Sequence, residues 1–374
     1  MKTTLFPNID WVGYVDWTVR DFHSYNTVQG ATYNSYLIRD EKTALIDAVK
    51  APYASQLLKN IDALTPLDSV AYIICNHAEP DHSGGLPAVL AACKNATLVC
   101  NAKCQKALSQ HYDITGWRIK VIASGESLSI GKRTLTFVDT PMVHWPESMV
   151  TYVKEDALLF SMDAFGQHYA FPNLFDDENS LPDLMREAKK YYANIVSPYG
   201  AQVVRTLEAL GGLTVRMIAP SHGVVWRSNI DAILSAYRDW SSDRPEPKAL
   251  VIYDSMWGST EQMARAIIDG ANIDGIRVKL IAVRASDLTE IATEAFDAAG
   301  IAFGTATLNK TMMPMMAAAM AYVKGLSLKK KAAFAFGSYG WGKGGATELN
   351  DMLKDTGWEL LCDPIRSQYK PTVE

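Results

Sequence analysis

The sequence predicts an α/β protein of two domains, with residues 1–248 in the first and residues 249–374 in the second. Three observations predict this class. Apolar runs of strand length alternate with helical stretches along the chain. Histidine or carboxylate side chains follow the ends of several predicted strands in the first part. A polar segment with two prolines, 241–248, then precedes a more regular alternation of strands and helices.

The composition is that of a folded protein and excludes some partners. With 374 residues, 48% hydrophobic and 21% charged, the chain can bury more than one core. Its formal net charge of -5 lacks the basic excess that binding to a phosphate backbone requires, so no nucleic-acid partner is expected. Neither a signal peptide nor a spanning segment is apparent, and we expect a cytoplasmic protein with no membrane partner.

Cysteine usage indicates a reducing compartment. The five cysteines are an odd number and have no Cys-x-x-Cys spacing, so neither a disulfide framework nor a zinc ribbon is predicted. We expect buried, reduced thiols.

The first domain is predicted to combine a mixed sheet with helices. Short alternating runs predict two or three antiparallel strands within residues 1–50. Further strands are predicted at 70–75, 97–100, 119–122, 134–139, 149–153, 157–161 and 215–220. Helices are predicted at 86–94, 102–112, 181–192 and 201–210.

Four potential metal ligands follow the strand at 70–75. His77, Glu79, Asp81 and His82 lie within six residues, and their adjacent like charges repel unless a cation offsets them. Gly84 and the glycine after it are expected to let the backbone turn tightly. A polar turn that happens to hold two histidines is the alternative.

Three later strands also end at potential ligands, namely His144, Asp163 and His222. One such residue is more often a structural cap than a ligand. Four strand ends in one domain favour a shared site, because ends on one edge of a sheet converge.

The spacing His-x-Glu-x-Asp-His differs from the His-x-His-x-Asp-His of zinc β-lactamase-type hydrolases by a carboxylate in place of an imidazole. Four imidazoles and three carboxylates suit two ions of iron or manganese better than a zinc pair. Asp163 could bridge the two ions.

The second domain is predicted to be a doubly wound sheet. Strands are predicted at 249–253, 277–283, 298–303, 331–336 and 359–362, and helices at 260–271, 312–324 and 346–355. The binding site should lie at the carboxyl ends of the first, third and fourth strands.

Loops at these ends suit flavin mononucleotide (FMN). Hydroxyls and free N–H groups at a helix start can bind its phosphate, small residues permit close approach, and aromatic rings can face the flavin. The candidate FMN-binding residues are Ser255, Met256, Trp257, Gly258, Ser259, Thr260, Thr305, Ala306, Thr307, Leu308, Asn309, Ser338, Tyr339, Gly340, Trp341 and Gly342.

The ligand series, the linker and the second half together resemble the flavodiiron proteins, also called A-type flavoproteins, over essentially the whole chain. The resemblance implies a metallo-β-lactamase-like αβ/βα domain followed by a flavodoxin-like domain. It also implies a site in which one iron is held by His77, Glu79 and His144, the other by Asp81, His82 and His222, and both by Asp163.

The resemblance further implies reduction of O2 to water, or of NO to N2O, in protection of an anaerobe from oxygen or nitrosative stress. It implies a head-to-tail homodimer, with a dimer of dimers as an extension. Because no rubredoxin-like extension with cysteine pairs is present, a separate donor is expected: rubredoxin, a reductase or a reduced deazaflavin. His23 and Tyr191 are expected in the substrate pocket, although a surface histidine and a packed tyrosine fit as well.

Two other functions remain possible from the sequence. One is a di-metal hydrolase of metallo-β-lactamase type with a fused flavin domain. The other is an electron carrier whose first domain is a docking scaffold.

Overall fold

The computed structural model describes residues 3–372, which form two compact units. The first unit contains the chain up to Arg20 together with Thr27–Tyr191 and Ala201–Arg238. The second contains Asp21–Asn26, Tyr192–Gly200 and the chain from Asp239 onward. Two short segments that precede residue 248 therefore cluster with the second unit, and the domain limits 1–248 and 249–374 stay a prediction.

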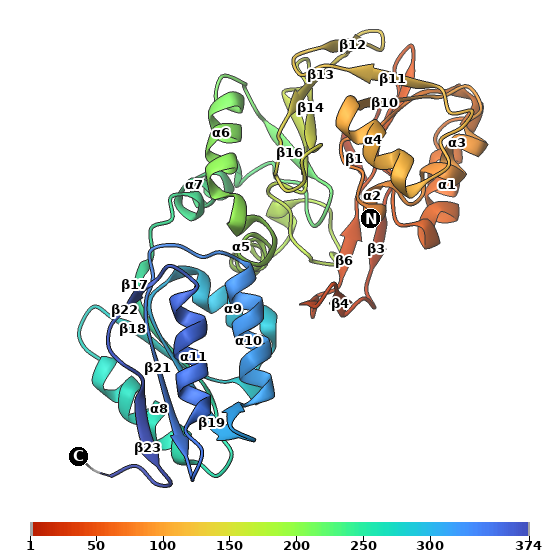
Figure 1. The fold of residues 1–374 in the computed structure, drawn as a ribbon. Coiled ribbons are helices and arrows are strands. Elements are labelled where there is room, and N and C mark those ends of the chain that lie inside the picture. The colour runs from red at the N-terminus through yellow and green to blue at the C-terminus, as the bar shows by residue number, and fades with distance from the viewer. Residues whose placement is uncertain (1–2, 373–374) are drawn as a thin grey trace. The chain divides into compact units, whose positions relative to one another are not determined.

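The first unit holds a seven-stranded mixed sheet (Figure 1), in the order β1-β2-β7-β8-β9-β10-β11. Strands β8, β9, β10 and β11 run parallel to one another, and the pairs β1–β2, β2–β7 and β7–β8 are antiparallel. The bounds are β1 Thr4–Phe6, β2 Ile9–Trp11, β7 Tyr36–Ile38, β8 Thr43–Ile46, β9 Val70–Ile74, β10 Thr97–Asn101 and β11 Ile119–Ile122.

A five-stranded sheet in the order β12-β13-β14-β15-β16 completes this unit. Every residue of β14 and β15 is buried, so these strands lie in the core. Only the β15–β16 pair in this sheet is parallel. The bounds are β12 Ser127–Ser129, β13 Thr134–Asp139, β14 Met149–Val153, β15 Leu158–Met162 and β16 Met217–Pro220.

The prediction of two or three strands in residues 1–50 is wrong, because the structure has eight short ones. Besides those above, β3 (Tyr14–Asp16) pairs with β6 (Ala31–Tyr33), and β4 (Asp21–Phe22) pairs with β5 (Tyr25–Asn26). The run 32–38 is interrupted at Asn34, whose backbone N–H donates to the Ser221 carbonyl. Its side-chain amide donates to two further carbonyls. Hydrogen bonds outside the ladder thus split one predicted strand into two.

The helices up to Ser241 include all four predicted ones, with ends shifted by at most two residues. Helix α1 has the apolar spacing of an amphipathic helix, although neither it nor α7 was predicted. The bounds are α1 Ala54–Asp62, α2 Pro80–Ser83, α3 Leu86–Ala92, α4 Ala102–His111, α5 Leu181–Tyr191, α6 Gly200–Leu210 and α7 Ile230–Ser241.

The second unit is built on a parallel sheet in the order β18-β17-β19-β21-β22, which confirms the doubly wound class. Strand β20 pairs with β19, and β23 pairs with β21. The bounds are β17 Glu246–Asp254, β18 Arg277–Ala282, β19 Ala298–Leu308, β20 Thr311–Met312, β21 Ala332–Tyr339, β22 Glu359–Leu360 and β23 Ile365–Gln368.

Helices cover both faces of this sheet (Figure 1). Alternate residues of β17 point to opposite faces: Val251 packs with α8, whereas Leu250 belongs to the cluster that contains α9, α10 and α11. Helix α9 was not predicted. The bounds are α8 Ser259–Ala271, α9 Leu288–Asp297, α10 Pro314–Gly325 and α11 Gly344–Lys354.

Three strands of the second unit are longer than predicted. Because β17 begins at Glu246, the expected linker 241–248 is reduced to the residues between Ser241 and this strand. Strands β19 and β21 extend to Leu308 and Tyr339, so part of each predicted loop continues the sheet. Ladder hydrogen bonds with neighbouring strands explain both extensions.

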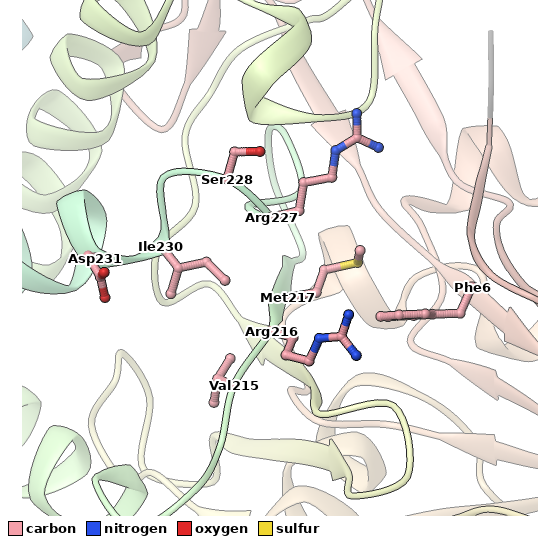
Figure 2. A pocket seen from close by; sticks show the side chains of 8 residues that line it. All are labelled: Phe6, Val215, Arg216, Met217, Arg227, Ser228, Ile230 and Asp231. Atoms are coloured by element: carbon pink, nitrogen blue, oxygen red, sulfur yellow. The ribbon is translucent and has the colours of Figure 1, made fainter.

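An open pocket of about 520 Å³ lies in the first unit, away from the predicted ligands (Figure 2). Arg227, one of its two arginines, already bonds Asp177 and lies over the Phe175 ring. Its lining consists of Phe6, Val215, Arg216, Met217, Arg227, Ser228, Ile230 and Asp231.

Within residues 3–372, no helix has both the length and the apolar character that crossing a bilayer requires.

Candidate metal centre

Asn76, the residue before the predicted ligands, is held from several directions. Its backbone N–H and its side-chain amide each donate to a different oxygen of buried Asp47, both at 2.8 Å. Its side-chain carbonyl accepts from Thr151 Oγ1 at 2.7 Å. The Cys75 thiol donates to the backbone carbonyl of His77 at 3.1 Å. The chain therefore enters the ligand loop with little freedom, as precise placement of ligands requires.

Gly84 is needed for close approach of two backbone segments rather than for the tight turn expected from the sequence. It and Gly85 have helical dihedrals, with φ of -60° and -78°. A Cβ atom on Gly84 would lie 2.4 Å from the carbonyl oxygen of Pro80 and 2.8 Å from the backbone nitrogen of Ala51. Glycine thus lets α2, which carries Asp81 and His82, pack against the preceding segment.

We expect Gly84→Ala to lower the free energy of unfolding by about 1–3 kcal/mol, because the added methyl group overpacks this contact. Metal content should fall as well, since α2 must shift. The control is Gly270→Ala in α8, where an added Cβ meets no atom within 4 Å. Denaturant unfolding followed by circular dichroism measures both variants. Equal stability of the two variants would contradict the close-approach explanation.

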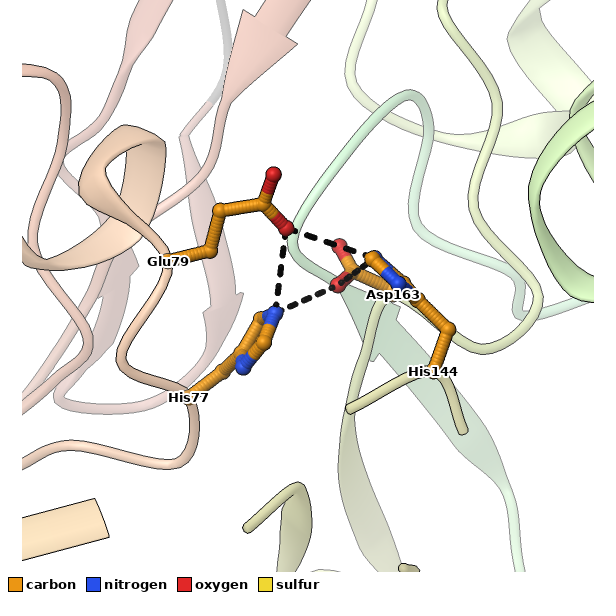
Figure 3. A group of neighbouring side chains, drawn as sticks. All are labelled: His77, Glu79, His144 and Asp163. Carbon is orange, nitrogen blue, oxygen red and sulfur yellow. Dashed lines mark hydrogen bonds and ion pairs between the residues drawn. The ribbon is translucent and has the colours of Figure 1, made fainter. Parts of the chain in front are cut away.

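The first group of candidate ligands surrounds one position between three strand ends (Figure 3). His77 Nε2 and His144 Nε2 lie 3.2 and 3.4 Å from Glu79 Oε2. They lie 3.6 and 3.3 Å from Asp163 Oδ2. Donor atoms about 2.0–2.2 Å from a common metal ion are separated by such distances.

The second group repeats this arrangement. His82 Nε2 and His222 Nε2 lie 3.3 and 3.1 Å from Asp81 Oδ2. They lie 3.2 and 3.5 Å from Asp163 Oδ1. Asp163 therefore directs one carboxylate oxygen to each group, which is the position of a bridging ligand.

The residues fit a pair of metal ions because several of their polar atoms are buried without a hydrogen bond. Among residues 3–372, both carboxylate oxygens of Asp163, both ring nitrogens of His82 and one oxygen of Asp81 have no hydrogen-bond partner. The three residues are at most 4% exposed. Burying such groups unpaired is costly, and cations would satisfy them. Three carboxylates and four imidazoles are a suitable donor set for iron.

The electrostatics also favour cations. Burial raises the pKa of Asp163, but the neighbouring His82 and His144 outweigh burial and hold it well below its usual range. Burial lowers the pKa of His77, yet hydrogen bonds with Glu147 and Glu79 raise it to about 9. Similar competition raises the pKa of His144 to about 10. The carboxylates thus favour protonation of the imidazoles. Metal ions that bind in place of these protons would displace them into solvent.

Two outer contacts orient the imidazoles, and the sequence analysis did not assign either one. His77 Nδ1 donates to Glu147 Oε1 at 2.8 Å, and His222 Nδ1 donates to the backbone carbonyl of Thr32 at 2.5 Å. Both contacts use Nδ1, so Nε2 is the ring nitrogen that faces the metal position. Glu147 could have been suspected from its place three residues after His144, but a carbonyl contact leaves no signal in sequence.

Family models match both halves of the chain. A model of the ODP family of β-lactamases matches residues 31–223, and a flavodoxin model matches residues 251–373. The chain is similar to a nitric oxide reductase of Moorella thermoacetica, with 40% identity over 98% of this chain and 92% of the relative.

A solved structure supplies the decisive similarity. The flavodiiron protein from Giardia intestinalis is 40% identical, with a TM-score of 0.97 over 100% of this chain and 92% of that chain. The chain belongs to the flavodiiron protein family. It is also similar to the rubredoxin oxygen:oxidoreductase of Desulfovibrio gigas, at 36% identity and a TM-score of 0.97, over 100% of this chain and 94% of that chain.

The flavodoxin domain of this flavodiiron protein indicates FMN, and three candidate loops meet at one edge of its sheet. Strands β17, β19 and β21 are neighbours and run parallel, so their carboxyl ends lie side by side. Thr260 Oγ1 and Ser338 Oγ lie 2.8 Å apart and link the first loop to the third. The backbone N–H of Gly345 donates to Thr307 Oγ1 at 3.2 Å. The assignment of individual FMN contacts stays a prediction.

The same edge offers a helix start and exposed rings. Helix α8 begins at Ser259, where first-turn N–H groups can bind a phosphate. Trp257 and Trp341 are 89% and 90% exposed. Such exposure of tryptophan is unusual in a folded domain, and it leaves both rings accessible to a flat ligand.

Tyr191 and His23, which are expected in the substrate pocket, and two further histidines differ in where they lie relative to the ligands. The His222 ring lies 6.0 Å from the ring of buried Tyr191 and 4.8 Å from the ring of His168. His111 is exposed at the end of α4. His23 is exposed in the turn between β4 and β5, a segment of the second unit, so its place in a substrate pocket stays a prediction.

Proposed function

We propose that this flavodiiron protein is an oxidoreductase that reduces O2 to water, NO to N2O, or both, at two iron ions fed by FMN. The observation that carries the proposal is the pair of buried ligand groups that share Asp163. The similarity of the chain to a nitric oxide reductase and to a rubredoxin oxygen:oxidoreductase supports NO and O2 as substrates. The organism would gain protection from oxygen or nitrosative stress.

In this proposal His77, Glu79 and His144 hold one ion, and Asp163 contacts both ions. The second ion is held by Asp81, His82 and His222. When bound, iron supplies the electrons that reduce the substrate, and FMN replaces them.

The substrate should approach from the side of Glu79 and His144. Their side chains are 15% and 14% exposed, whereas those of the other five candidate ligands are at most 4% exposed. Tyr191 is buried, and its ring lies 6.0 Å from that of His222. Burial, followed by nearby Asp163, raises the pKa of Tyr191 well above its ordinary value. Its hydroxyl therefore stays protonated and can donate a hydrogen bond.

The two alternatives fit less well. A di-metal hydrolase has no use for a flavodoxin domain, and the similar proteins of known activity are oxidoreductases. An electron carrier would have no use for seven ligand residues gathered around two positions.

We also propose that electrons come from a separate donor, with rubredoxin as the first choice because it appears in the name of the Desulfovibrio gigas relative. A reductase or a reduced deazaflavin remains a further choice. A head-to-tail homodimer, with a dimer of dimers as its extension, stays part of the proposal. Sedimentation of the purified chain, whose mass is 41.2 kDa, distinguishes monomer, dimer and tetramer.

The test is an anaerobic one. The purified protein is assayed for iron and FMN, reduced, and mixed separately with O2 and with NO while flavin absorbance is followed. About two irons and about one FMN per chain, with rapid reoxidation by at least one gas, would support the reductase. Zinc in place of iron, or a reduced flavin that neither gas reoxidises, would contradict the reductase and favour the di-metal hydrolase.

A further inference from the structure

The two metal positions have matching sets of inner ligands. Each is surrounded by two imidazoles, one carboxylate of its own and one oxygen of Asp163. Because the formal charge of the inner ligands is the same at both positions, the charge of the inner ligands does not distinguish the two ions. Groups outside the ligand set can then add a difference in affinity and reduction potential.

Glu147 supplies such a difference beside His77. Its side chain is 4% exposed, and its Oε1 accepts from His77 Nδ1 at 2.8 Å and from the backbone N–H of Ala78 at 3.2 Å. The Glu147 backbone carbonyl accepts from the Asn101 side chain at 2.8 Å. The carboxylate is therefore fixed in place and aligned with one ligand.

The outer contacts at the other position are of a different kind. His222 Nδ1 donates to a neutral backbone carbonyl, that of Thr32. His82 has no hydrogen-bond partner on either ring nitrogen within residues 3–372. Asp47 acts electrostatically on both His82 and His77, with the larger effect on His82, but its carboxylate hydrogen-bonds Asn76, whereas Glu147 hydrogen-bonds the ligand His77 itself.

We propose that Glu147 is a positioning residue that makes the two metal positions unequal. By holding His77 and adding negative charge behind it, Glu147 strengthens binding at the position of His77, Glu79 and His144. The added negative charge also favours the higher oxidation state there, which lowers the reduction potential of that ion relative to its neighbour. The ion on the side open to substrate is thus the more easily oxidised of the two.

This inference rests on the proposed di-iron site, and metal titration tests it without turnover. Full-length protein stripped of iron is titrated with Co²⁺ while visible absorbance is recorded. We expect Glu147→Gln to weaken one of two binding steps by about 10- to 100-fold and to leave the other unchanged. Asp10→Asn is the control, because it also removes a buried carboxylate, one bonded to Arg39 and Thr4 instead of a ligand. Equal weakening of both steps, or of neither, would overturn the proposal.

A second readout separates charge from packing. In protein loaded with ⁵⁷Fe, Glu147→Gln should alter the Mössbauer doublet of one iron and raise the potential of one ion in a redox titration. Glu147→Asp, which keeps the carboxylate, should restore part of both. Equal shifts of both irons in Glu147→Gln would contradict the assignment. Wild-type protein that binds fewer than two ions would instead refute the proposed function, so the two failures are distinguishable.

Discussion

Asp163→Asn should remove the paired metal site and with it all reductase activity. The amide offers one neutral oxygen, and its NH2 group would face imidazole nitrogens now 3.2–3.6 Å from the carboxylate. Both ions lose a negatively charged ligand at once. We expect iron binding to weaken by more than about 100-fold, beyond the effect of losing an outer contact. Iron per chain and the rate of flavin reoxidation measure the effect.

The control for this variant is Asp139→Asn. Asp139 also ends a strand, β13, but its side chain accepts from Asn101 and contacts no candidate ligand. Iron content and turnover should stay near those of the wild type. An Asp163→Asn protein that kept both irons and turned over within about tenfold of the wild type would show that the carboxylate is no bridge.

His144→Ala should abolish turnover while the flavin remains fully reducible. His144 contributes one of two imidazoles at the position open to substrate, so its loss should cost more than about 100-fold in affinity for that ion. FMN binds in the other compact unit and should be retained at wild-type stoichiometry. The measurement is paired: flavin reduction by the donor, then reoxidation by O2 or NO.

His111→Ala is the matched control, because it removes an exposed histidine at the end of α4. It should leave reduction and reoxidation unchanged. If His144→Ala instead reoxidised as fast as this control, the flavin alone would be the reactive centre, and the electron-carrier hypothesis would replace the reductase.

The candidate ligands could be predicted because each one lies in the loop or turn that follows an apolar run. Strand and ligand are adjacent in sequence, and the sheet brings the strand ends together, as for His77 and Asp163. The parallel sheet of the second unit was predictable for the same reason, since each of its central strands is one continuous apolar run.

Contacts between residues that are far apart in the chain could not be predicted from the sequence. Glu147 is 70 residues from His77, and Thr32 acts through a backbone carbonyl that any residue possesses. Gly84 was recognised as special for the wrong reason, because a close approach to Ala51 depends on tertiary packing.

Some elements that were not predicted do have a signal in the sequence. Helix α9 begins after Asp287, whose side chain accepts from the Glu290 N–H, and Glu three residues after an N-cap is a known start signal. The eight short N-terminal strands were less accessible, because tertiary hydrogen bonds such as those of Asn34 interrupt their patterns.

The most direct test of the central claim is anomalous diffraction at the iron absorption edge, on crystals of the protein as purified. The site described above predicts two iron peaks, one among His77, Glu79 and His144, with one oxygen of Asp163 at each peak. The second peak should lie among Asp81, His82 and His222. A single peak, or two peaks of which Asp163 contacts only one, would contradict the shared site.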